Sequence, residues 1–295
     1  MLNRLAIGSA NFGLEYGIAN RKKLPKEEVF RILQTASAQG IWGVDTAKDY
    51  GDSEKVIGNY FKEHGKSIHL ITKLPKKEYQ TPQEVEKEVL DSIQALHISS
   101  IDVLLVHSYE TLKQHGKVIL PALQTLRREK VIGRYGVSVY HPEEAKEISR
   151  VLKDPLAMEF PVNLFDRRFL KADLLQKFHA EGGVSFARSV FLQGLFFLKE
   201  ENLTGPFEKV KSRVRLIHEI AKEHEVKPEW ISLLFVMAQP WIDNVIVGVD
   251  CEEQLMSHVQ ALTEDSFKRY RTLEHLLPEL ETSDEEIIVP SRWRR

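Results

Sequence analysis

The sequence predicts an α/β fold: a single (β/α)8 TIM barrel over residues 1–295, in which 263–295 form a C-terminal helix and tail. Short apolar runs alternate with helical hydrophobic patterns along the chain, and no linker-like segment separates them. Alternation of this kind indicates a parallel sheet, and eight such units without a break indicate that the sheet closes. A length of 295 residues is ordinary for one barrel domain.

The first element of each unit is a short apolar run, which we interpret as a buried strand. The predicted strands run from Leu5 to Ser9, Trp42 to Asp45, His69 to Thr72, Asp102 to Val106, Gly133 to Val137, Ala157 to Pro161, Val184 to Ala187 and Val245 to Val247.

The second element of each unit is predicted to be a helix from the spacing of its apolar residues. Residues that share a helical face are Val29, Ile32, Leu33 and Ala36, then Val85, Val89, Ile93 and Leu96, and later Val210, Val214, Ile217 and Ala221. Helix starts are marked by Pro25, Pro82 and Pro142, since proline is tolerated in the first turn. Gly40 and Gly182 stand where helix-ending glycines are expected.

A doubly wound open sheet is the alternative architecture. It fits less well, because the first strand is not followed by a Gly-x-Gly-x-x-Gly turn of the kind that binds phosphate in such sheets.

Composition narrows the class of protein. Hydrophobic residues make up 42% of the chain, enough for a sizeable core, and a formal charge of -2 with interspersed signs gives no electrostatic case for a nucleic-acid partner. The single cysteine, Cys251, excludes an internal disulfide and suits a reducing compartment. The start of the chain lacks the pattern of a signal peptide, and the apolar stretch from Trp230 to Trp241 is too short to span a membrane. We therefore expect a cytoplasmic protein, and no spacing typical of a metal site is present.

Four residues in the first third of the chain suggest one proton-transfer site. Asp45, Lys73 and His107 each end a short apolar run, so each is predicted to lie just past a strand. Tyr50 is expected in the loop or first helical turn after the second strand. Because reactive groups of such barrels gather at the carboxyl ends of the strands, these side chains are expected at one mouth, together with Ser138.

The chemistry of these side chains fits a general acid. A phenol has a pKa of about 10, and a nearby lysine ammonium would pull that pKa toward the working range. A carboxylate would keep the lysine charged and oriented, and a histidine opposite would donate a hydrogen bond to a carbonyl oxygen or share the proton transfer. Each residue alone has a plainer interpretation: Asp45 as a helix cap, Lys73 as a loop lysine, His107 as a core histidine and Tyr50 as cover for apolar surface.

Taken in order, the motifs of the chain resemble those of the aldo-keto reductases, which reduce carbonyls with a nicotinamide cofactor on a (β/α)8 barrel. The motifs that carry the resemblance are Leu5 to Gly13, Asp45-Thr-Ala-Lys-Asp-Tyr50-Gly-Asp-Ser-Glu54, Thr72-Lys73, Val106-His107-Ser108, Gly136-Val-Ser138, Asn163 to Arg167, Ala187-Arg188-Ser189, Val245 to Val249 and Gln254-Leu255. The resemblance implies that Asp45, Tyr50, Lys73 and His107 are the catalytic residues.

The same resemblance implies contacts to the cofactor. Ser138 and Asn163 match positions near the nicotinamide, whereas Glu159 stands where relatives commonly have a glutamine, and a carboxylate cannot donate a hydrogen bond to the carboxamide oxygen. Arg188 stands where many relatives have an aromatic residue against the nicotinamide ring, and it is expected either to stack there through its guanidinium or to pair with Glu159.

The resemblance also implies a phosphate-side segment, and it bears on the choice of cofactor. Ser189, Gln193 and Gly194 resemble the segment on the phosphate side of the cofactor. The places that discriminate NADP from NAD are taken by Gly248, Val249, Gln254 and His258, without fixed positive charges. Backbone amides at the helix start near Glu252 are still able to hold a phosphate through their dipoles. We expect weak discrimination, with NADP(H) slightly favoured over NAD(H).

The substrate is expected to be a small-molecule carbonyl compound, and nothing in the sequence reports the oligomeric state. The segment from Asn11 to Asn20 is more similar to the sugar- and small-aldehyde-handling branches of the family than to the steroid-handling ones. Candidates for an aromatic wall are Phe12, Tyr16, Tyr79, Tyr109 and Phe165. The tail from Pro290 to Arg295 either folds over the mouth or is a solvated terminus, the second being slightly favoured.

Two other functions stay open at this stage. Lys73 at a strand end is also compatible with the Schiff-base nucleophile of an aldolase-like lyase. Alternatively, the barrel binds its cofactor as a regulatory subunit without turnover.

Overall fold

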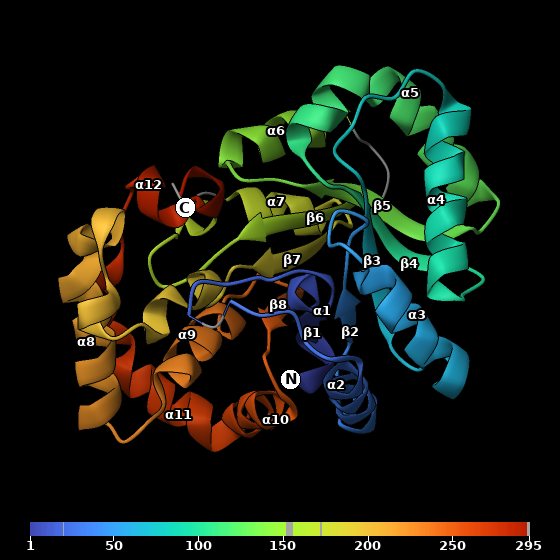
Figure 1. The fold of residues 1–295 in the computed structure, drawn as a ribbon. Coiled ribbons are helices and arrows are strands. Elements are labelled where there is room, and N and C mark those ends of the chain that lie inside the picture. The colour runs from blue at the N-terminus through green and yellow to red at the C-terminus, as the bar shows by residue number, and fades with distance from the viewer. Residues whose placement is uncertain (20, 152–155, 172, 294–295) are drawn as a thin grey trace.

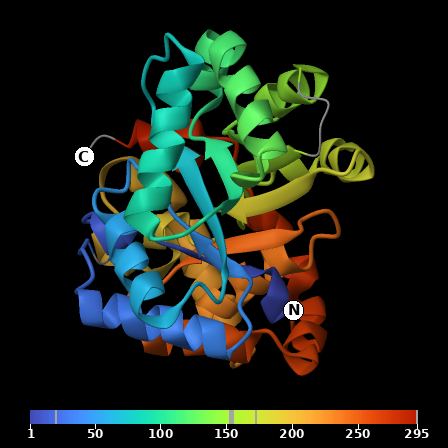
Figure 2. The same cartoon turned by 90° about the vertical axis from the view of Figure 1, so that its right-hand side faces the viewer.

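The computed structural model describes residues 1–19, 21–151, 156–171 and 173–293, and it confirms the predicted (β/α)8 barrel. Each strand pairs in parallel with the next, and the first pairs with the last, so the sheet is closed. Figures 1 and 2 show the helices packed around the outside of this barrel. The strands are β1 (Leu5–Gly8), β2 (Gly43–Asp45), β3 (His69–Leu74), β4 (Ile101–Val106), β5 (Ile132–Ser138), β6 (Leu156–Pro161), β7 (Val184–Arg188) and β8 (Asn244–Gly248).

The strands lie where they were predicted, with shifts of one or two residues at their ends. The largest shift is in β3, which continues through Lys73 to Leu74 because these residues pair with Leu105 and Val106 of β4. We had predicted that Lys73 lies just past the third strand. It is instead a residue of β3.

The helices cover the outer face of the barrel. They are α1 (Ala10–Gly13), α2 (Lys26–Ala38), α3 (Ser53–His64), α4 (Pro82–Leu96), α5 (Tyr109–Arg128), α6 (Pro142–Val151), α7 (Leu174–Ala180), α8 (Lys211–Glu223), α9 (Pro228–Met237), α10 (Glu252–Ala261), α11 (Glu264–Leu273) and α12 (Glu285–Ile288). Short 3-10 helices lie at η1 (Leu2–Arg4), η2 (Arg168–Leu170), η3 (Leu192–Phe197), η4 (Glu200–Asn202), η5 (Gly205–Val210), η6 (Glu274–Leu276), η7 (Pro278–Leu280) and η8 (Pro290–Arg292).

Most helix predictions are confirmed in detail. The predicted face of α2 is fully buried, and Pro82 and Pro142 begin α4 and α6. Two boundaries differ: Pro25 is the extended cap residue before α2, and Val210 ends η5 one residue before α8 starts. Both have backbone angles outside the helical region, which spacing alone cannot reveal.

The core has two parts. Inside the barrel, Ala6, Ile71, Val103, Leu105, Ala157, Phe186 and Ile246 form one buried cluster that fills the lumen. A larger cluster packs the helices against the outer face of the sheet. Because the lumen is filled, a ligand cannot enter the middle of the barrel, and a site built by the strands is expected at one of its ends.

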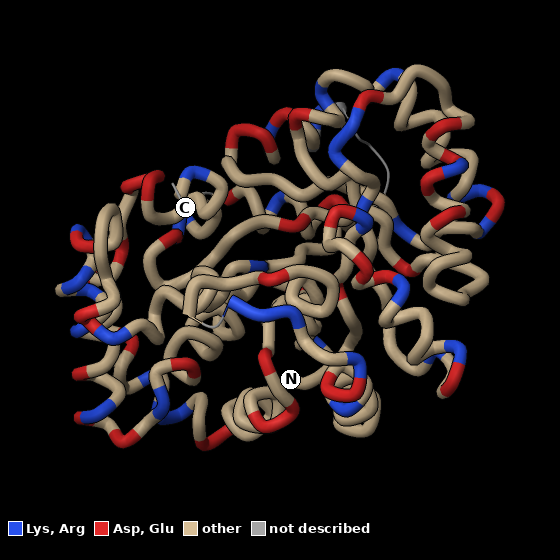
Figure 3. The backbone as a smooth tube through the Cα atoms, viewed as in Figure 1, with Lys and Arg blue, Asp and Glu red and all other residues tan. Residues whose placement is uncertain are grey.

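The surface carries both signs of charge. Figure 3 shows lysine and arginine interspersed with aspartate and glutamate around the outer helices. Among the described residues, no helix combines the length and apolar character needed to cross a membrane.

The segment 263–295 is more structured than the predicted helix and tail. Up to residue 293 it contains α11, α12 and the 3-10 helices η6, η7 and η8, whereas residues 294 and 295 lie outside the described part. In Figure 1 the segment leads from α11 to α12, and α12 packs near η5.

Candidate active site

A cavity of about 650 Å³ lies at the carboxyl ends of the strands. It is lined by the last residues of five strands, which are Gly8, Asp45, Ser138, Arg188 and Gly248. This is the end of the barrel at which enzymes of this architecture carry their reactive groups.

Most site residues predicted from the sequence line this cavity. They are Asp45, Tyr50, His107, Ser138, Glu159, Arg188, Ser189, Gln193, Gly194, Gly248, Gln254 and His258. Lys73 and Asn163 are not in the lining and lie behind it, where they contact residues that are. The sequence motifs thus identified one contiguous place in the fold.

Tyr50 lies in the loop between β2 and α3, as predicted. A Cβ atom at Gly13 would lie 1.8 Å from the Tyr50 carbonyl oxygen, so only glycine lets α1 pack this closely against the loop. Ser53 Oγ donates to the Ser9 carbonyl oxygen over 3.0 Å, and Thr46 Oγ1 donates to Ser53 Oγ over 2.9 Å. The backbone that carries the phenol is therefore held from both sides.

Lys73 is buried completely beside Tyr50. Its ammonium donates to Oδ1 of Asp45 and, over 3.2 Å, to the Thr46 carbonyl oxygen, and it lies 3.2 Å from Oε2 of Glu159. It is 5.3 Å from the centroid of the Tyr50 ring. Burial alone would lower the pKa of Lys73, but the two carboxylates raise it. The ammonium therefore stays charged next to the phenol.

The two carboxylates around Lys73 respond differently to burial. Burial raises the pKa of Asp45 to about 7; Lys73 opposes this shift and Glu159 reinforces it. Burial also disfavours ionised Glu159, but the charges of Lys73 and Arg188 outweigh it and hold the pKa of Glu159 below its usual range. Glu159 therefore stays ionised, whereas Asp45 is the carboxylate able to take up a proton.

Burial raises the pKa of the Tyr50 phenol above its ordinary value of about 10. Lys73 lowers this pKa, in the predicted direction, but Asp45 and Glu159 add to the effect of burial. Lys73 thus acts in the predicted direction, but burial and the two carboxylates outweigh it, so the pKa of the phenol stays above its ordinary value. The phenol is protonated at neutral pH, which is the form that a general acid requires.

His107 directly follows β4, as predicted, and its ring lies 5.6 Å from the Tyr50 ring at an interplanar angle of 85°. Its Nδ1 lies 2.8 Å from Oδ2 of Asp49. Burial lowers the pKa of His107, the charges of Lys73 and Lys76 add to this effect, and Asp49 opposes it. Our sequence reasoning missed Asp49, although it stands next to Tyr50 in the same motif.

Arg188 pairs with Glu159, which is one of the two contacts that the sequence left open, and its guanidinium also lies over the ring of Tyr140. Its Nε lies 3.1 Å from Oε1 of Glu159, and its guanidinium lies 4.2 Å from the centroid of the Tyr140 ring. Ser138 Oγ donates to the same oxygen of Glu159 over 3.1 Å. Glu159 is thus surrounded by Lys73, Arg188 and Ser138, which explains how a carboxylate stays charged while buried.

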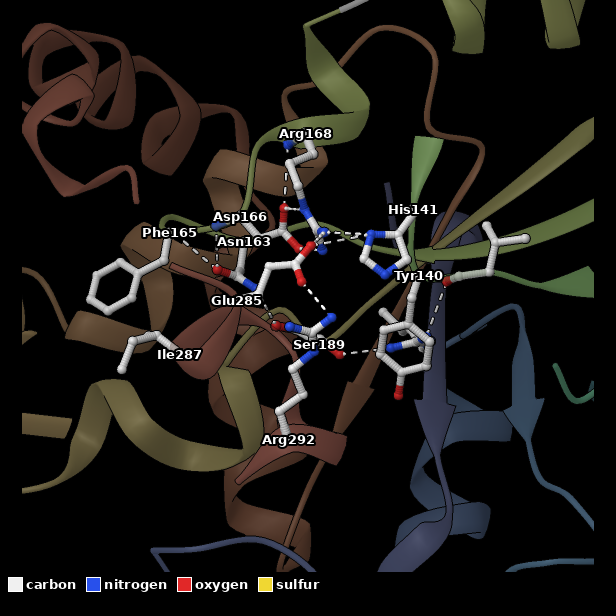
Figure 4. A network of polar contacts seen from close by, with 12 residues as sticks. Tyr140, His141, Asn163, Phe165, Asp166, Arg168, Ser189, Glu285, Ile287 and Arg292 are labelled. Atoms are coloured by element: carbon white, nitrogen blue, oxygen red, sulfur yellow. Dashed lines mark hydrogen bonds and ion pairs between the residues drawn. The ribbon is translucent and has the colours of Figure 1, made fainter. Parts of the chain in front are cut away.

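Asn163, which the resemblance places near the nicotinamide, lies behind the cavity lining. Its Oδ1 accepts hydrogen bonds from the amides of Phe165 and Asp166, each over 2.9 Å, and its Nδ2 donates to the Ser189 carbonyl oxygen over 3.1 Å (Figure 4). An asparagine that accepts from amides two and three residues ahead forms a local turn. Asn163 therefore holds the Ser189 segment in place and does not face the cavity.

The segment after β7 has an unusual backbone. Ser189, Leu192, Gln193 and Gly194 have positive φ angles between 46° and 91°. Such angles outside glycine cost free energy and gather at ligand-binding sites. Ser189, Gln193 and Gly194 line the cavity, where the phosphate-side segment was predicted.

The start of α10 differs from the prediction. The amide of Glu252, which we expected to be available to a phosphate, donates to Oε1 of Glu28 over 2.8 Å. The side chain of Gln254 is also engaged, because its Oε1 accepts from the amide of Asp250 over 2.7 Å. A carboxylate therefore already occupies part of the helix N-terminus.

His258 lies in the last part of α10 and is buried. Its ring lies 5.1 Å from the Phe191 ring, and its Nδ1 has no hydrogen-bond partner within the described residues. Burial and the charge of Lys227 lower the pKa of His258 to about 4. A neutral imidazole thus lines the cavity here. Lys227, which donates to Ser257 over 3.0 Å, is a cation near this region that the sequence reasoning missed.

The predicted aromatic wall is mostly wrong. Tyr16 lines the cavity, but Phe12, Tyr79 and Phe165 are fully buried core residues, and the hydroxyl of Tyr109 donates to Glu147. The aromatic residues that line the cavity besides Tyr16 and Tyr50 are Tyr140, Phe191 and Phe197. Which aromatic side chains point inward depends on loop conformation, which the sequence does not specify.

The C-terminal segment packs over the mouth. Trp293 is buried, its Nε1 donates to the Ile287 carbonyl oxygen over 3.0 Å, and its ring lies 4.9 Å from that of Phe207. Pro290 lines the cavity. The interpretation of a solvated terminus is therefore wrong for residues 290–293, and the predicted tail residues Arg294 and Arg295 lie outside the described residues.

Glu285 of α12 connects this segment to the loops of the barrel. Its carboxylate lies 3.5 Å from Nδ1 of His141, 3.6 Å from Nη1 of Arg168 and 2.6 Å from Nη2 of Arg292 (Figure 4). Arg168 is itself held by Asp166 over 2.8 Å.

Within the described residues, no group of three or more histidine, cysteine or acidic side chains is arranged to hold a metal ion.

Comparisons with known proteins agree with this picture. A family model described as "Aldo/keto reductase family" matches residues 4–274. The chain is 28% identical to "Uncharacterized oxidoreductase YqkF" of Bacillus subtilis (82% of this chain, 86% of the relative) and 26% identical to "Aldo-keto reductase str7" of Strobilurus tenacellus (84% and 81%). A solved structure of aldo-keto reductase AKR11C1 from Bacillus halodurans matches with a TM-score of 0.73 at 20% identity, over 92% of this chain and 91% of that one.

Proposed function

This chain belongs to the aldo/keto reductase family, and we propose that it is an NAD(P)H-dependent oxidoreductase that reduces an aldehyde or ketone to an alcohol with Tyr50 as general acid. The observation that carries the proposal is the buried ammonium of Lys73, 5.3 Å from the centroid of the Tyr50 ring and paired with Asp45 and Glu159.

The cavity supports binding of a nicotinamide cofactor. Its volume of about 650 Å³ lies within the range of small-molecule sites, roughly 300–1,000 Å³. Ser138 and Arg188 would hold the nicotinamide end, the Ser189 to Gly194 segment the phosphates, and the region around Gly248 and His258 the far end. When bound, the cofactor would supply a hydride to the carbonyl carbon.

The residues of the chain handle the proton. Tyr50 is protonated at neutral pH and gives its hydrogen to the carbonyl oxygen as negative charge develops there. Lys73 stabilises the phenolate that is left, because its ammonium is charged and is held beside the phenol by Asp45. His107 lies against the Tyr50 ring and faces the same cavity, so it is placed to orient the carbonyl oxygen.

We propose a small polar substrate of the sugar-like kind. Lys76, His107 and Tyr140 line the cavity with Tyr50, and each offers a hydrogen-bonding group to a hydroxylated substrate.

The test is turnover with a matched variant. Purified protein given NADPH or NADH and a panel of aromatic and sugar aldehydes should oxidise the cofactor. Tyr50→Phe should lower kcat by several powers of ten while cofactor binding, followed by protein fluorescence, stays nearly unchanged. Equal rates for wild type and Tyr50→Phe would refute the assignment. Tight cofactor binding by the wild type without turnover of any carbonyl would favour the regulatory barrel.

For the cofactor, we propose weak discrimination with NADP(H) slightly favoured. The Glu28 carboxylate at the Glu252 amide disfavours a 2′-phosphate, whereas Lys227 near Ser257 and His258 favours one. These opposing charges should give dissociation constants for NADPH and NADH that differ by well under a hundredfold. Fluorescence titration with each reduced cofactor measures this ratio, and a hundredfold preference for either would contradict the proposal.

The structure argues against the lyase alternative. A Schiff base needs a neutral amine, but Asp45 and Glu159 raise the pKa of Lys73 and keep it protonated. Borohydride in the presence of substrate should therefore leave Lys73 unmodified.

A further inference from the structure

Asp49 contacts His107, the histidine that lines the cavity beside Tyr50. Its Oδ2 lies 2.8 Å from Nδ1 of His107 and also accepts from the amide of Lys76 over 3.1 Å. Asp49 does not line the cavity, whereas His107 does. Asp49 can therefore act on a ligand through the side chain of His107, and it also holds the backbone of Lys76, which lines the same cavity.

The geometry of the pair is close but not linear. Nδ1 of His107 is buried and lies off the axis that would complete a hydrogen bond to the carboxylate. At a separation of 2.8 Å, a rotation of either side chain would complete the hydrogen bond, and catalytic hydrogen bonds are often poorly aligned before a ligand binds. Since Nδ1 is covered, Nε2 is the ring nitrogen left for a ligand.

An ionised carboxylate accepts hydrogen bonds and cannot donate them. Asp49 is held ionised: burial disfavours the charge, but His107 and the Lys76 amide outweigh it and keep the pKa of Asp49 below its usual value. The hydrogen of neutral His107 is therefore on Nδ1, which leaves only a lone pair on Nε2. His107 can donate a hydrogen bond to a carbonyl oxygen only when it is protonated on both nitrogens.

We infer that Asp49 is a positioning residue that fixes the Nδ1–H tautomer of His107 and thereby makes carbonyl reduction depend on the protonated form of that histidine. The inference rests on the proposed function. It assigns neutral His107 the complementary role of accepting a hydrogen bond from a hydroxyl group at Nε2.

The groups around His107 set where this transition falls. Lys73 of β3, Lys76 in the loop after β3 and burial disfavour the protonated ring, while Asp49 in the loop after β2 and Glu159 of β6 favour it. The Tyr50 ring meets it edge to face. Because the groups that disfavour protonation dominate, the pKa of His107 lies below that of an ordinary histidine. Above this pKa, kcat/KM for reduction should fall tenfold per pH unit.

The direct test is the tautomer itself, observed by ¹⁵N NMR of histidine-labelled protein without cofactor, with His107→Gln used to assign the signal. The wild type should show a protonated Nδ1 and a bare Nε2, and Asp49→Ala should shift the neutral form toward Nε2–H. A wild-type ring with its hydrogen on Nε2, or a tautomer that Asp49→Ala leaves unchanged, would overturn the inference.

The kinetic test uses pH profiles of kcat/KM with one good carbonyl substrate. Asp49→Asn should move the inflection at least half a pH unit lower, because the favourable charge is gone. Asp49→Ala should flatten the profile, because neutral His107 then donates from Nε2. Asp52→Asn is the matched control, since Asp52 lies in the same loop, pairs with Lys23 over 2.7 Å and does not contact His107, so its inflection should not move.

The two tests separate two kinds of failure. If the NMR result holds but no carbonyl is reduced, the proposed function is wrong and the tautomer assignment stands. If reduction occurs with the same inflection in wild type, Asp49→Asn and Asp49→Ala, the positioning role is wrong and the reductase assignment stands.

Discussion

Glu159 changes the electrostatics of the site at the scale of single residues. It places a second buried carboxylate next to Lys73 and so requires a second cation, which Arg188 supplies. Asp45, Lys73, Glu159 and Arg188 form a buried set with alternating sign and no net formal charge. Burying charges is tolerated when each is paired, and it becomes very unfavourable when one partner is removed.

Removing Lys73 should therefore harm the fold as well as the chemistry. Lys73→Met leaves buried Asp45 without its cation and Glu159 with Arg188 alone, and we expect a loss of about 3–5 kcal/mol in the free energy of unfolding. Urea denaturation measures this loss. The control is Lys77→Met, an exposed lysine paired with Glu88, for which the loss should stay within about 1 kcal/mol. Equal unfolding midpoints for the two variants would show that the buried charges are not coupled.

At the scale of elements, the C-terminal segment from α12 to η8 acts as a wall of the cavity held by charge and by one aromatic anchor. Glu285 joins His141, Arg168 and Arg292, and Trp293 is buried against Phe207. Arg168 keeps its pairing with Asp166 whether or not Glu285 is charged. Loss of the Glu285 charge should therefore leave the barrel loops folded but weaken the attachment of the C-terminal segment.

Glu285→Gln should raise KM more than it lowers kcat. Partly exposed ion pairs contribute about 0.2–1 kcal/mol each, so the loss of these pairs predicts a KM for the carbonyl substrate roughly three- to tenfold higher. Steady-state kinetics at saturating cofactor gives both constants. Glu279→Gln, on the exposed side of η7 in the same segment, is the control and should match the wild type. A drop in kcat with unchanged KM would mean that the segment does not shape substrate binding.

At the scale of the whole molecule, the barrel was predictable because hydrophobic periodicity is local and closure follows from eight repeated units. Asp45 and Ser138 lie at strand ends for the same reason. Asp49 and His107 could not be paired from the sequence, because their contact depends on how the loop after β2 folds across β3. The sequence also could not show that the side chain of Asn163 forms a local turn behind the cavity, because a turn-forming asparagine and a ligand-binding one look the same in sequence.

His258 connects the cavity to the stability of the entire fold. Its pKa is near 4 in the folded protein because of burial and Lys227, whereas an unfolded chain has the ordinary value of about 6.5. Below pH 6.5 His258 is protonated in the unfolded chain but stays neutral in the folded protein. The free energy of unfolding that is present at higher pH is therefore lost as the pH falls toward 4. Between pH 7.5 and pH 5 this one group should remove about 2 kcal/mol of unfolding free energy.

A variant comparison isolates this contribution from the other titrating groups. Urea unfolding of wild type and His258→Gln at pH 7.5 and pH 5 should show that the variant loses about 2 kcal/mol less than the wild type on acidification. His275→Gln, an exposed histidine in η6, should lose as much as the wild type. Equal losses of unfolding free energy in all three proteins would mean that His258 is protonated as easily when folded as when unfolded. The assignment of a buried neutral imidazole beside the cavity would then be wrong.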